Sequence, residues 1–510
     1  MPDTRLLTGD DLTVEDVWEV ATHGALVGLS DTAVARMQAA RTLVAETARG
    51  EHTYGVNTGF GRFVSRSIPD ELAEELQLRL LRSHACGVGD PYPDDVVRAA
   101  MLLRANALAK GFSGARTETV DLLIECLNRG VLPRVPARGS VGASGDLAPL
   151  AHLALPLVGE GEAWVEEELL PGGEALAAVG LEPIRLAAKE GLSLINGTQF
   201  MAAMCALGVI RSRRLARAAD IAAALSVEAL QGSRTSFLGA IHAARPLRGQ
   251  GDSATNIRLL LEGSAIIESH RWCDKVQDAY SLRCAPQVHG ASRDLLDYVE
   301  ATVSVELNAA TDNPLVLVDE GQVVSNGNFH GQPLAFALDA LAMAAAELAN
   351  ISERRLERLV NPSLSEGLPP FLTAEGGLNS GFMIPQYVAA ALVSENKALC
   401  HPASVDSIPT SAGQEDHVSM GNAAGLKAQV VLGNAERAVA IELLAAAQGV
   451  EFLAPLEPGA GVGAARRFVR TLSERLGDDR PLGGDIERVA GAIRDGSLIR
   501  AVEDEVGSLR

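Results

Sequence analysis

A segment rich in glycine and serine, GSVGASGDLAPLAH at residues 139–152, holds the residue types with the most distinctive chemistry in this chain. Its centre is Ala143-Ser144-Gly145, three of the smallest residues in a row, and an apolar, helix-like run follows. Glycines gather where a backbone turns tightly or lies close to another group. The segment is therefore a candidate phosphate loop, a candidate nucleophile, a simple turn, or a backbone that reacts with itself.

The first two interpretations lack their usual signals. A phosphate-binding loop has a lysine after its last glycine, and none follows here. A nucleophile elbow reads Gly-x-Ser-x-Gly on an α/β fold, whereas residues 142–146 read Gly-Ala-Ser-Gly-Asp. The chain also has no HExxH and no cysteine–histidine spacing typical of a metal site, and GFGRFV (59–64) is a weak dinucleotide signal. A turn before a helix, with Asp146 as the N-cap, stays open.

The remaining interpretation is a condensation within the backbone. In a sufficiently tight turn the Gly145 nitrogen can attack the carbonyl carbon of Ala143 and close a five-membered ring. Loss of two waters, one of which uses the Ser144 hydroxyl, would leave an exocyclic methylidene. Ala143 is too small to block the approach, and Gly145 adds no side chain that would strain the turn. The product would be a strong electrophile, made by proximity from the chain itself.

Composition restricts the class of protein. The 510 residues carry a net charge of −21, and 47% are hydrophobic but only 4% aromatic, which predicts an aliphatic, alanine-rich core. So acidic a surface disfavours partners such as nucleic acid and anionic membranes. The six cysteines form no CxxC pair, and the start MPDTRLLTGDDLTVEDV lacks the pattern of a signal peptide. We expect a reduced, soluble, cytoplasmic protein.

The periodicity predicts a mainly all-α fold. Apolar residues recur at helical spacing, and runs of 25–30 residues would form helices on the order of 40 Å long. We expect a loop-rich N-terminal domain over residues 1–200 and a bundle of long helices over 201–510. Such helices usually find partner helices, so an oligomer is expected. The following ranges are the predicted long helices: 208–232, 329–360, 383–400 and 424–453.

Strands and loops fill the rest of the prediction. Residues 160–190 hold the only strand-like material, which we interpret as one short β-hairpin. Lys110-Gly111 is a predicted helix C-cap, and another helix is expected over about 116–129. Besides YGVNTGFGRF (54–63), glycine-rich loops are expected over the following ranges: 248–255, 285–291, 309–314, 325–332 and 405–421.

Together with the Ala-Ser-Gly segment, several separated motifs give the sequence a family resemblance. It resembles the aromatic amino acid ammonia-lyase family over nearly its whole length, and within the family it is most similar to the bacterial histidine ammonia-lyases. Departures from the pattern at Cys86, His289 and Pro385 remove no functional group. The motifs are YGVNTGFG (54–61), SHACGVGDP (83–91), LINGTQ (194–199), VQDAYSLRCAPQVHG (276–290), DNPL (312–315), NGNFHGQP (326–333) and QEDHVSMG (414–421).

The resemblance implies a fold, a reaction and a prosthetic group. The fold is that of the fumarase/aspartase-like superfamily, and the assembly is a homotetramer whose sites combine loops of more than one chain. The group is 4-methylidene-imidazol-5-one, formed from Ala143-Ser144-Gly145, with no dissociable cofactor and no metal. The reaction is non-oxidative elimination of ammonia from L-histidine to give trans-urocanate. Whether the amine or the substrate ring attacks the methylidene stays open.

The family also implies roles for residues in the other motifs. Tyr54 and Tyr280, two of only five tyrosines, are assigned to proton removal and to hydrogen bonding at the prosthetic group, and we favour Tyr54 as the base. Arg283 offers a planar fork to the substrate carboxylate. Three further residues are expected to contact the substrate or the prosthetic group: Asn196 and Gln277 through their amides, and Phe329 by packing.

Substrate choice is expected to depend on His84 and Glu415. An imidazole carries a donor and an acceptor nitrogen, which a histidine and a carboxylate can match. A phenyl ring would leave both groups desolvated and unpaired. The neutral interpretation of QEDH is a solvated helix start. On a helix, adjacent side chains point about 100° apart and cannot converge on one metal ion.

Two alternative functions are also compatible with parts of the sequence. A tyrosine or phenylalanine ammonia-lyase, or an aminomutase, would use the same electrophile, although Glu415 argues against these. A catalytically idle helical scaffold would need the Ala-Ser-Gly turn or its partners to have decayed, and all of them are intact in the sequence.

Overall fold

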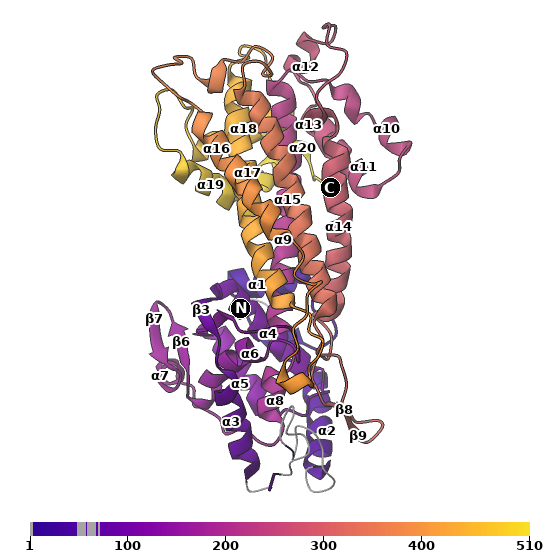
Figure 1. Ribbon diagram of the computed structural model, residues 1–510, viewed down its shortest axis with the longest axis vertical. Helices are drawn as coiled ribbons and strands as arrows, with labels where there is room; N and C mark the ends of the chain where they lie inside the picture. Colours follow the sequence, from indigo (N-terminus) through magenta and orange to yellow (C-terminus); the bar gives the residue numbers. More distant parts are fainter. Residues whose placement is uncertain (1–3, 48–57, 59–67, 70–71) are drawn as a thin grey trace. The chain divides into compact units, whose positions relative to one another are not determined.

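The computed structural model describes residues 4–47, 58, 68–69 and 72–510, and it is built mainly of α-helices (Figure 1). Helix starts and ends follow the local sequence. At helix α1 (Val14–His23), Thr13 Oγ1 accepts a hydrogen bond from Asp16 N, the Asp16 carboxylate accepts one from Thr13 N, and Gly24 ends the helix at φ +69°. This is a capping box followed by a left-handed glycine. The predicted mainly all-α fold is confirmed.

By contacts the chain divides into two compact units, and neither is continuous in sequence. The first unit comprises Met1–Leu207, Val299–Asp339 and Pro402–Leu426. The second comprises Gly208–Tyr298, Ala340–His401 and Lys427–Arg510. The two units are therefore interleaved along the chain. The division into domains at residue 200 stays a prediction.

The first unit contains short helices and several very short strands. The predicted hairpin is confirmed as the antiparallel pair β6–β7, but the expectation that it is the only strand material is wrong. Its helices are α2 (Asp31–Thr47), α3 (Ala73–His84), α4 (Asp94–Ala109), α5 (Thr117–Asn128), α6 (Leu147–Ala154), α7 (Gly172–Ala178) and α8 (Glu190–Ile195), with 3-10 turns η3 (Leu155–Val158) and η6 (Ser411–Gly413). Its strands are β1 (Arg5–Leu7), β2 (Val27–Leu29), β3 (Val88–Pro91), β4 (Val131–Pro133), β5 (Pro136–Arg138), β6 (Glu162–Val165), β7 (Glu168–Pro171), β8 (Leu315–Leu317) and β9 (Gln322–Val324).

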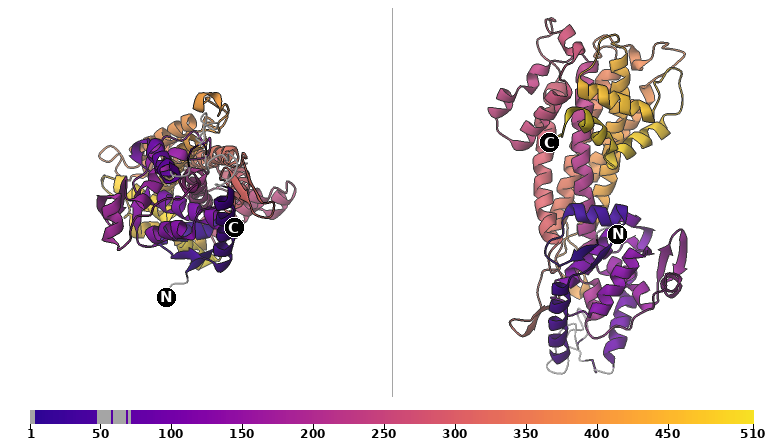
Figure 2. Two further views of the ribbon diagram at one scale, coloured as in Figure 1. Left: turned by 90° about the horizontal axis from the view of Figure 1, so that it is seen from below. Right: turned by 180° about the vertical axis from the view of Figure 1, so that it is seen from behind.

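Four long helices each contribute to both units, so they join the units covalently. The longest have 31 residues, or about 46 Å at the usual rise. In Figures 1 and 2 their second-unit parts run side by side, and buried ion pairs join them, such as Arg355 on one to Glu442 on another at 2.5 Å. The four are α9 (Gln199–Ala229), α14 (Ala285–Glu306), α15 (Gln332–Val360) and α17 (Gly421–Glu451).

Of the described helices, α15 alone is long and apolar enough to match a membrane span, and 72% of its apolar window is buried inside the protein. It therefore has the character of a core helix. The second unit also contains α10 (Gly239–Ala243), α11 (Arg248–Leu260), α12 (Ala265–Ser269), α13 (Tyr280–Arg283), α16 (Met383–Leu399), α18 (Ala460–Leu472), α19 (Gly483–Arg494) and α20 (Ser497–Val506).

Two of the expected glycine-rich loops are helical. Residues 248–255 lie within α11, and residues 285–291 lie within α14. A Cβ on Gly249 would lie 2.4 Å from the Gly290 carbonyl oxygen, and a Cβ on Gly290 would lie 2.3 Å from Gln250 N. The loop prediction is wrong here because these glycines serve close contact between two helix backbones rather than a turn.

Candidate active site

The Ala143-Ser144-Gly145 segment forms a strained reversal of the backbone. Ser144 adopts φ +52°, which is unusual for a residue with a side chain, and it lies between Gly142 at +73° and Gly145 at +72°. Ala143 and Gly145 are buried, and Ser144 is partly exposed. Strain of this kind concentrates at functional sites, and here it falls on the serine that would supply the leaving hydroxyl.

A second segment presses against the reversal. Gly197 N donates to Ser144 O at 3.3 Å, and Asp146 N donates to Gly197 O at 2.6 Å, so that Gly145 and Gly197 form an isolated parallel bridge. A Cβ on Gly145 would lie only 1.9 Å from Gly197 O. Glycine is therefore required at 145 both by the left-handed conformation and by the close contact.

A third segment closes the other side. Met420 N donates to Val141 O at 2.9 Å, and Ser419 Oγ donates to Gly142 O at 3.3 Å. A Cβ on Gly142 would lie 2.0 Å from Ser419 Oγ. Two stretches that are distant from the reversal in the sequence therefore hold it, and each contains one of the motifs on which the family resemblance rests.

Asp146 stands at the N-cap position of α6, as predicted, but its carboxylate does not cap that helix. Its Oδ1 accepts from Ser140 Oγ at 2.8 Å, and its Oδ2 accepts from Met201 N at 3.0 Å, in the first turn of α9. Burial raises the pKa of Asp146 to about 6, against the effect of these hydrogen bonds. Asp146 thus fastens the reversal to the start of α9.

Asn196 follows α8 and is buried. Its backbone carbonyl accepts a hydrogen bond from Arg104 Nη1 at 2.7 Å. Its side-chain Oδ1 is buried and has no hydrogen-bond partner among the described residues. A buried amide oxygen left unsatisfied calls for an explanation, and a ligand that donates a hydrogen bond at this position would provide one.

His84 and Glu415 interact within the first unit. Burial lowers the pKa of His84, whereas its bond to the Leu80 carbonyl and the negative charge of Glu415 act to raise it. His84 Nδ1 lies 2.9 Å from both Leu80 O and Ser83 Oγ; in the tautomer with its proton at Nδ1, the ring donates to the Leu80 carbonyl and Nε2 remains as an acceptor. Glu415 Oε2 accepts from Thr410 Oγ1 at 2.7 Å.

The helix-start interpretation of QEDH is wrong. Glu415 pairs with Thr410 in an isolated antiparallel bridge, and residues 416–420 form no helix. The bridge holds the Glu415 backbone while its side chain is fixed by the Thr410 hydroxyl. Across the described ranges no group of three or more His, Cys, Asp or Glu side chains could hold a metal ion.

The loop that carries Phe329 meets the loop that carries Glu415. Phe329 is half-buried in a turn after β9. The next residue, His330, directs Nε2 at the His417 carbonyl oxygen at 3.2 Å, and the two imidazole rings stack with centroids 5.8 Å apart. These contacts connect the loop of Phe329 to the loop of Glu415.

The remaining predicted residues fall elsewhere. Gln277, Tyr280 and Arg283 belong to the second unit; Gln277 is exposed, and Tyr280 is 71% exposed with the Arg283 guanidinium 4.7 Å from its ring centroid. Tyr54 lies outside the described residues. Their assembly with the first-unit loops therefore stays a prediction.

Sequence reasoning missed several supporting residues. Arg104, Gly197 and Ser419 all touch the segments around the reversal. A signal for Arg104 existed: it is a lone charge within the apolar run MLLRANALA (101–109). The serine and the glycine stood inside motifs already noted, but nothing in their spacing said what they would contact.

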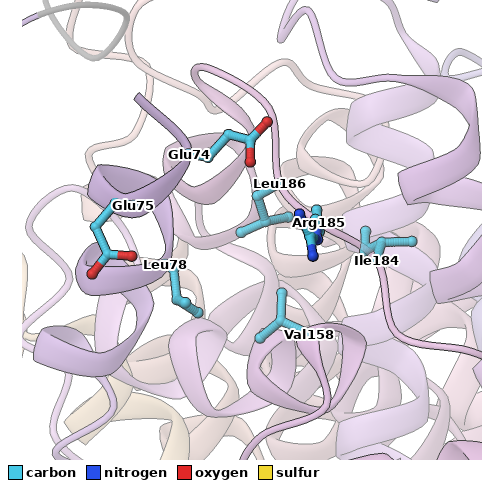
Figure 3. Close-up of a pocket in the computed structure, with 7 residues that line it drawn as sticks. All are labelled: Glu74, Glu75, Leu78, Val158, Ile184, Arg185 and Leu186. Atoms are coloured by element: carbon cyan, nitrogen blue, oxygen red, sulfur yellow. The ribbon is translucent and has the colours of Figure 1, made fainter. Parts of the chain in front are cut away.

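One cavity in the first unit is lined by none of the site residues described above (Figure 3). It has a volume of about 280 Å³ and is formed by α3, η3 and residues 184–186. Its walls are Glu74, Glu75, Leu78, Val158, Ile184, Arg185 and Leu186. None of the predicted site residues lines it, so we assign it no part in the chemistry.

Comparison with known proteins agrees with the fold and the loops. The family described as aromatic amino acid lyase matches residues 12–471. Histidine ammonia-lyase of Gloeobacter violaceus is 56% identical over 510 residues, covering 100% of this chain and 99% of its own. Its counterpart from Anaeromyxobacter sp. is 55% identical over 506 residues, covering 97% and 99%.

Solved structures give the same result. Histidine ammonia-lyase from Trypanosoma cruzi superimposes with a TM-score of 0.91 at 47% identity, covering 99% of this chain and 96% of its own. Tyrosine aminomutase from Streptomyces globisporus gives 0.94 at 38% identity, with both chains covered completely. The full-length identity to relatives named histidine ammonia-lyase identifies the chain as a carbon–nitrogen lyase. The chain belongs to the aromatic amino acid lyase family.

Proposed function

We propose that the enzyme eliminates ammonia from L-histidine and releases trans-urocanate. The observation that carries the proposal is that His84 and Glu415 both belong to the unit that also holds the Ala143–Gly145 reversal, where the charge of Glu415 acts to raise the pKa of His84. Neutral His84 offers an acceptor nitrogen and Glu415 an anionic acceptor, which suit the two N–H groups of a protonated imidazole. The full-length identity to relatives named histidine ammonia-lyase supports the same substrate.

The residues present fit a 4-methylidene-imidazol-5-one formed from Ala143, Ser144 and Gly145. The reversal is left-handed at Ser144, and the Gly145–Gly197 bridge uses Asp146 N and Gly197 N as its donors, so Gly145 N takes no part in it. The unpartnered Oδ1 of Asn196 is free to accept a hydrogen bond from the substrate, since the condensed ring itself has no N–H to donate. Such a group supplies an electrophile that withdraws electrons from the amino acid, which eases departure of ammonia.

The chain's own residues would bind the substrate and move its protons. Arg283 would hold the carboxylate as a bidentate partner. Gln277 would contribute an amide, and Phe329 would pack against the ring. Tyr54 would take the β-proton, for which its pKa must fall from about 10, with Tyr280 hydrogen bonding in support. The positions of Gln277, Tyr280 and Arg283 relative to the first-unit loops belong to the proposal.

We further propose a cytoplasmic homotetramer in which each site takes residues from more than one chain. The loop before α13 supports this, because a single chain leaves its large side chains in solvent. Trp272 is 89% exposed, Val276 97% and Tyr280 71%. Apolar side chains exposed in a group mark an interaction surface. Of the predicted catalytic or binding residues, Gln277 lies on this loop and Tyr280 begins α13 directly after it.

The second candidate is a tyrosine or phenylalanine ammonia-lyase or an aminomutase. It is favoured by the likeness to tyrosine aminomutase at a TM-score of 0.94. Glu415 speaks against it, because a phenyl or phenol ring offers no cationic partner to a desolvated carboxylate.

Both candidates are tested by comparing three substrates. We expect absorbance of urocanate from L-histidine, and little cinnamate or coumarate from phenylalanine or tyrosine at equal enzyme concentration. The intact mass of the chain should be lower than the sequence mass by two waters, located to residues 143–145. Turnover of tyrosine alone would replace the substrate assignment, and an unmodified mass would remove the chemistry altogether.

A further inference from the structure

Arg104 presents an unusual buried charge beneath the active-site loops. It lies on α4 with 0% of its surface exposed. Burial lowers its pKa to about 10, while the charge of Asp312 acts in the opposite direction, so the guanidinium remains charged near neutral pH. A buried charge is costly and is normally paired with an opposite one. Asp312, however, forms its own ion pair with Lys189 at 2.6 Å.

The partners of Arg104 are neutral oxygens beside the reversal. Nη1 donates to Asn196 O at 2.7 Å and to Gln199 Oε1 at 3.0 Å. Gln199 Nε2 in turn donates to Thr311 Oγ1 at 3.1 Å, which fixes the orientation of that amide. Nε and Nη2 of Arg104 are buried and have no partner among the residues that the structure describes. The guanidinium is therefore fixed through one nitrogen to the segment 196–199.

That segment is the one that presses on the reversal. Gly197 takes φ +154°, and a Cβ placed there would lie 2.4 Å from Gln199 Oε1 and 2.7 Å from Arg104 Nη1. On its other side the Gly197 backbone bonds to Ser144 O and Asp146 N. The backbone at 197 is thus held between the Arg104 head group and the reversal at 144–146.

We propose that Arg104 is a positioning residue for formation of the prosthetic group: it holds residues 196–197 against Ala143–Gly145 so that the turn stays closed enough to cyclise. The inference rests on the proposed function. The Gly145 nitrogen bonds to the Ala143 carbonyl carbon, and the first water takes that carbonyl oxygen with the amide hydrogens of Ser144 and Gly145. The second water takes the Ser144 hydroxyl and its Cα hydrogen, so no oxidant is needed.

The test is the intact mass of the full-length Arg104→Met variant, measured alongside circular dichroism. We expect a helical chain in which most molecules keep both waters at 143–145, whereas the wild type has lost them. Arg104→Lys should be processed in part, because an ammonium keeps the charge and can still reach one acceptor. A merely structural role would lower the unfolding temperature without changing the mass.

Arg98→Met is the matched control. Arg98 lies on the same helix, is half-buried, and likewise donates to backbone carbonyls, those of Val20 and Leu127 at 3.1–3.4 Å. Its loss removes the same charge from α4 without touching residues 196–199, so this variant should be fully processed. Full processing of a folded Arg104→Met chain would overturn the inference.

If Arg104→Met fails to fold, the Thr311→Val and Arg104→Lys variants test the inference instead. Thr311→Val removes the hydroxyl that orients Gln199, and we expect slower loss of the two waters after a pulse of expression. Processing of both variants at the wild-type rate would overturn the inference. A wild-type chain that keeps both waters would instead contradict the proposed function, so the two failures are distinguishable.

Discussion

At the scale of single residues, the hydrogen bonds of His84 and Glu415 are the basis on which we propose a histidine substrate. His84 uses Nδ1 on the Leu80 carbonyl and keeps Nε2 as an acceptor. Glu415 is oriented by the Thr410 hydroxyl. Both side chains therefore accept hydrogen bonds, and a protonated imidazole supplies two N–H donors, whereas phenylalanine supplies none.

We expect Glu415→Gln to lose most of its activity on histidine. The amide keeps the size of the side chain but removes the charge that matches an imidazolium, at a cost of about 1–3 kcal/mol, or roughly fivefold to 150-fold in kcat/KM. Steady-state kinetics measured by urocanate absorbance would show it. Asp416→Asn, which changes the exposed neighbour, should leave kcat/KM within about twofold. Near-normal turnover by Glu415→Gln would contradict the role given to Glu415, although not the family assignment.

The sequence singled out the candidate reactive residues but not the residues that hold them. Ala143, Ser144 and Gly145 stood out because small residues at that spacing permit only a few kinds of chemistry. The contact of Gly145 with Gly197 depends on tertiary folding that brings together distant segments, and no local pattern reports it. Arg104 shows the same limit, since its partners are backbone and amide oxygens that any residue could offer.

At the scale of secondary structure, the packing of α11 against α14 explains why two glycine-rich stretches are helical. Glycine in a helix is unfavourable by about 0.5–1 kcal/mol relative to alanine. Here Gly249 and Gly290 let the two helix backbones touch, and the packing gained offsets the loss. Helices of this kind cannot be told from loops by glycine content alone.

Gly249→Ala should destabilise the protein, because its Cβ would lie 2.4 Å from the Gly290 carbonyl oxygen, which is backbone and cannot move aside easily. Overpacking of this kind costs about 1–3 kcal/mol. Gly251→Ala lies in the same helix with open space around its Cβ, and it should stabilise by about 0.5 kcal/mol. Thermal unfolding of the two variants under one buffer condition compares them. Equal unfolding temperatures would contradict the close-contact explanation.

Three of the four long helices were predictable, whereas α14 and most of the strands were not. A helix of 29 or 31 residues repeats its apolar pattern many times, so α9, α15 and α17 leave a clear signal. Most strands here have three residues, too few for an alternating pattern. Their pairing depends on which distant segment lies beside them, as where β3 pairs with β5.

At the scale of the whole molecule, the predicted site residues are divided between two units of the chain. The first unit holds Ser144, Asn196 and Glu415, and the second holds Gln277 and Arg283. Within a symmetric oligomer, one chain's second-unit residues can serve another chain's loops. The exposure of the loop before α13 is the structural reason to expect this arrangement.

Mixed assemblies test whether sites are shared. Ser144→Ala and Arg283→Met chains should each be inactive alone. When they are co-expressed with different tags and purified through both, we expect about one quarter of wild-type activity, the share of sites with both parts intact in random mixing. Two differently tagged Ser144→Ala chains serve as the control and should give none. Absence of recovery in the mixed sample would mean that each site is built within one chain.

The hydrogen bonds from residues 419–420 to the reversal bear on when the prosthetic group could form during protein synthesis. Val141 and Gly142 are fastened by Ser419 and Met420, which leave the ribosome long after the Ala-Ser-Gly triplet does. On the proposed chemistry, a nascent or misfolded polypeptide would therefore keep an unreacted Ser144. The electrophile would form only after the surrounding structure, which shields it from other cellular nucleophiles, has folded.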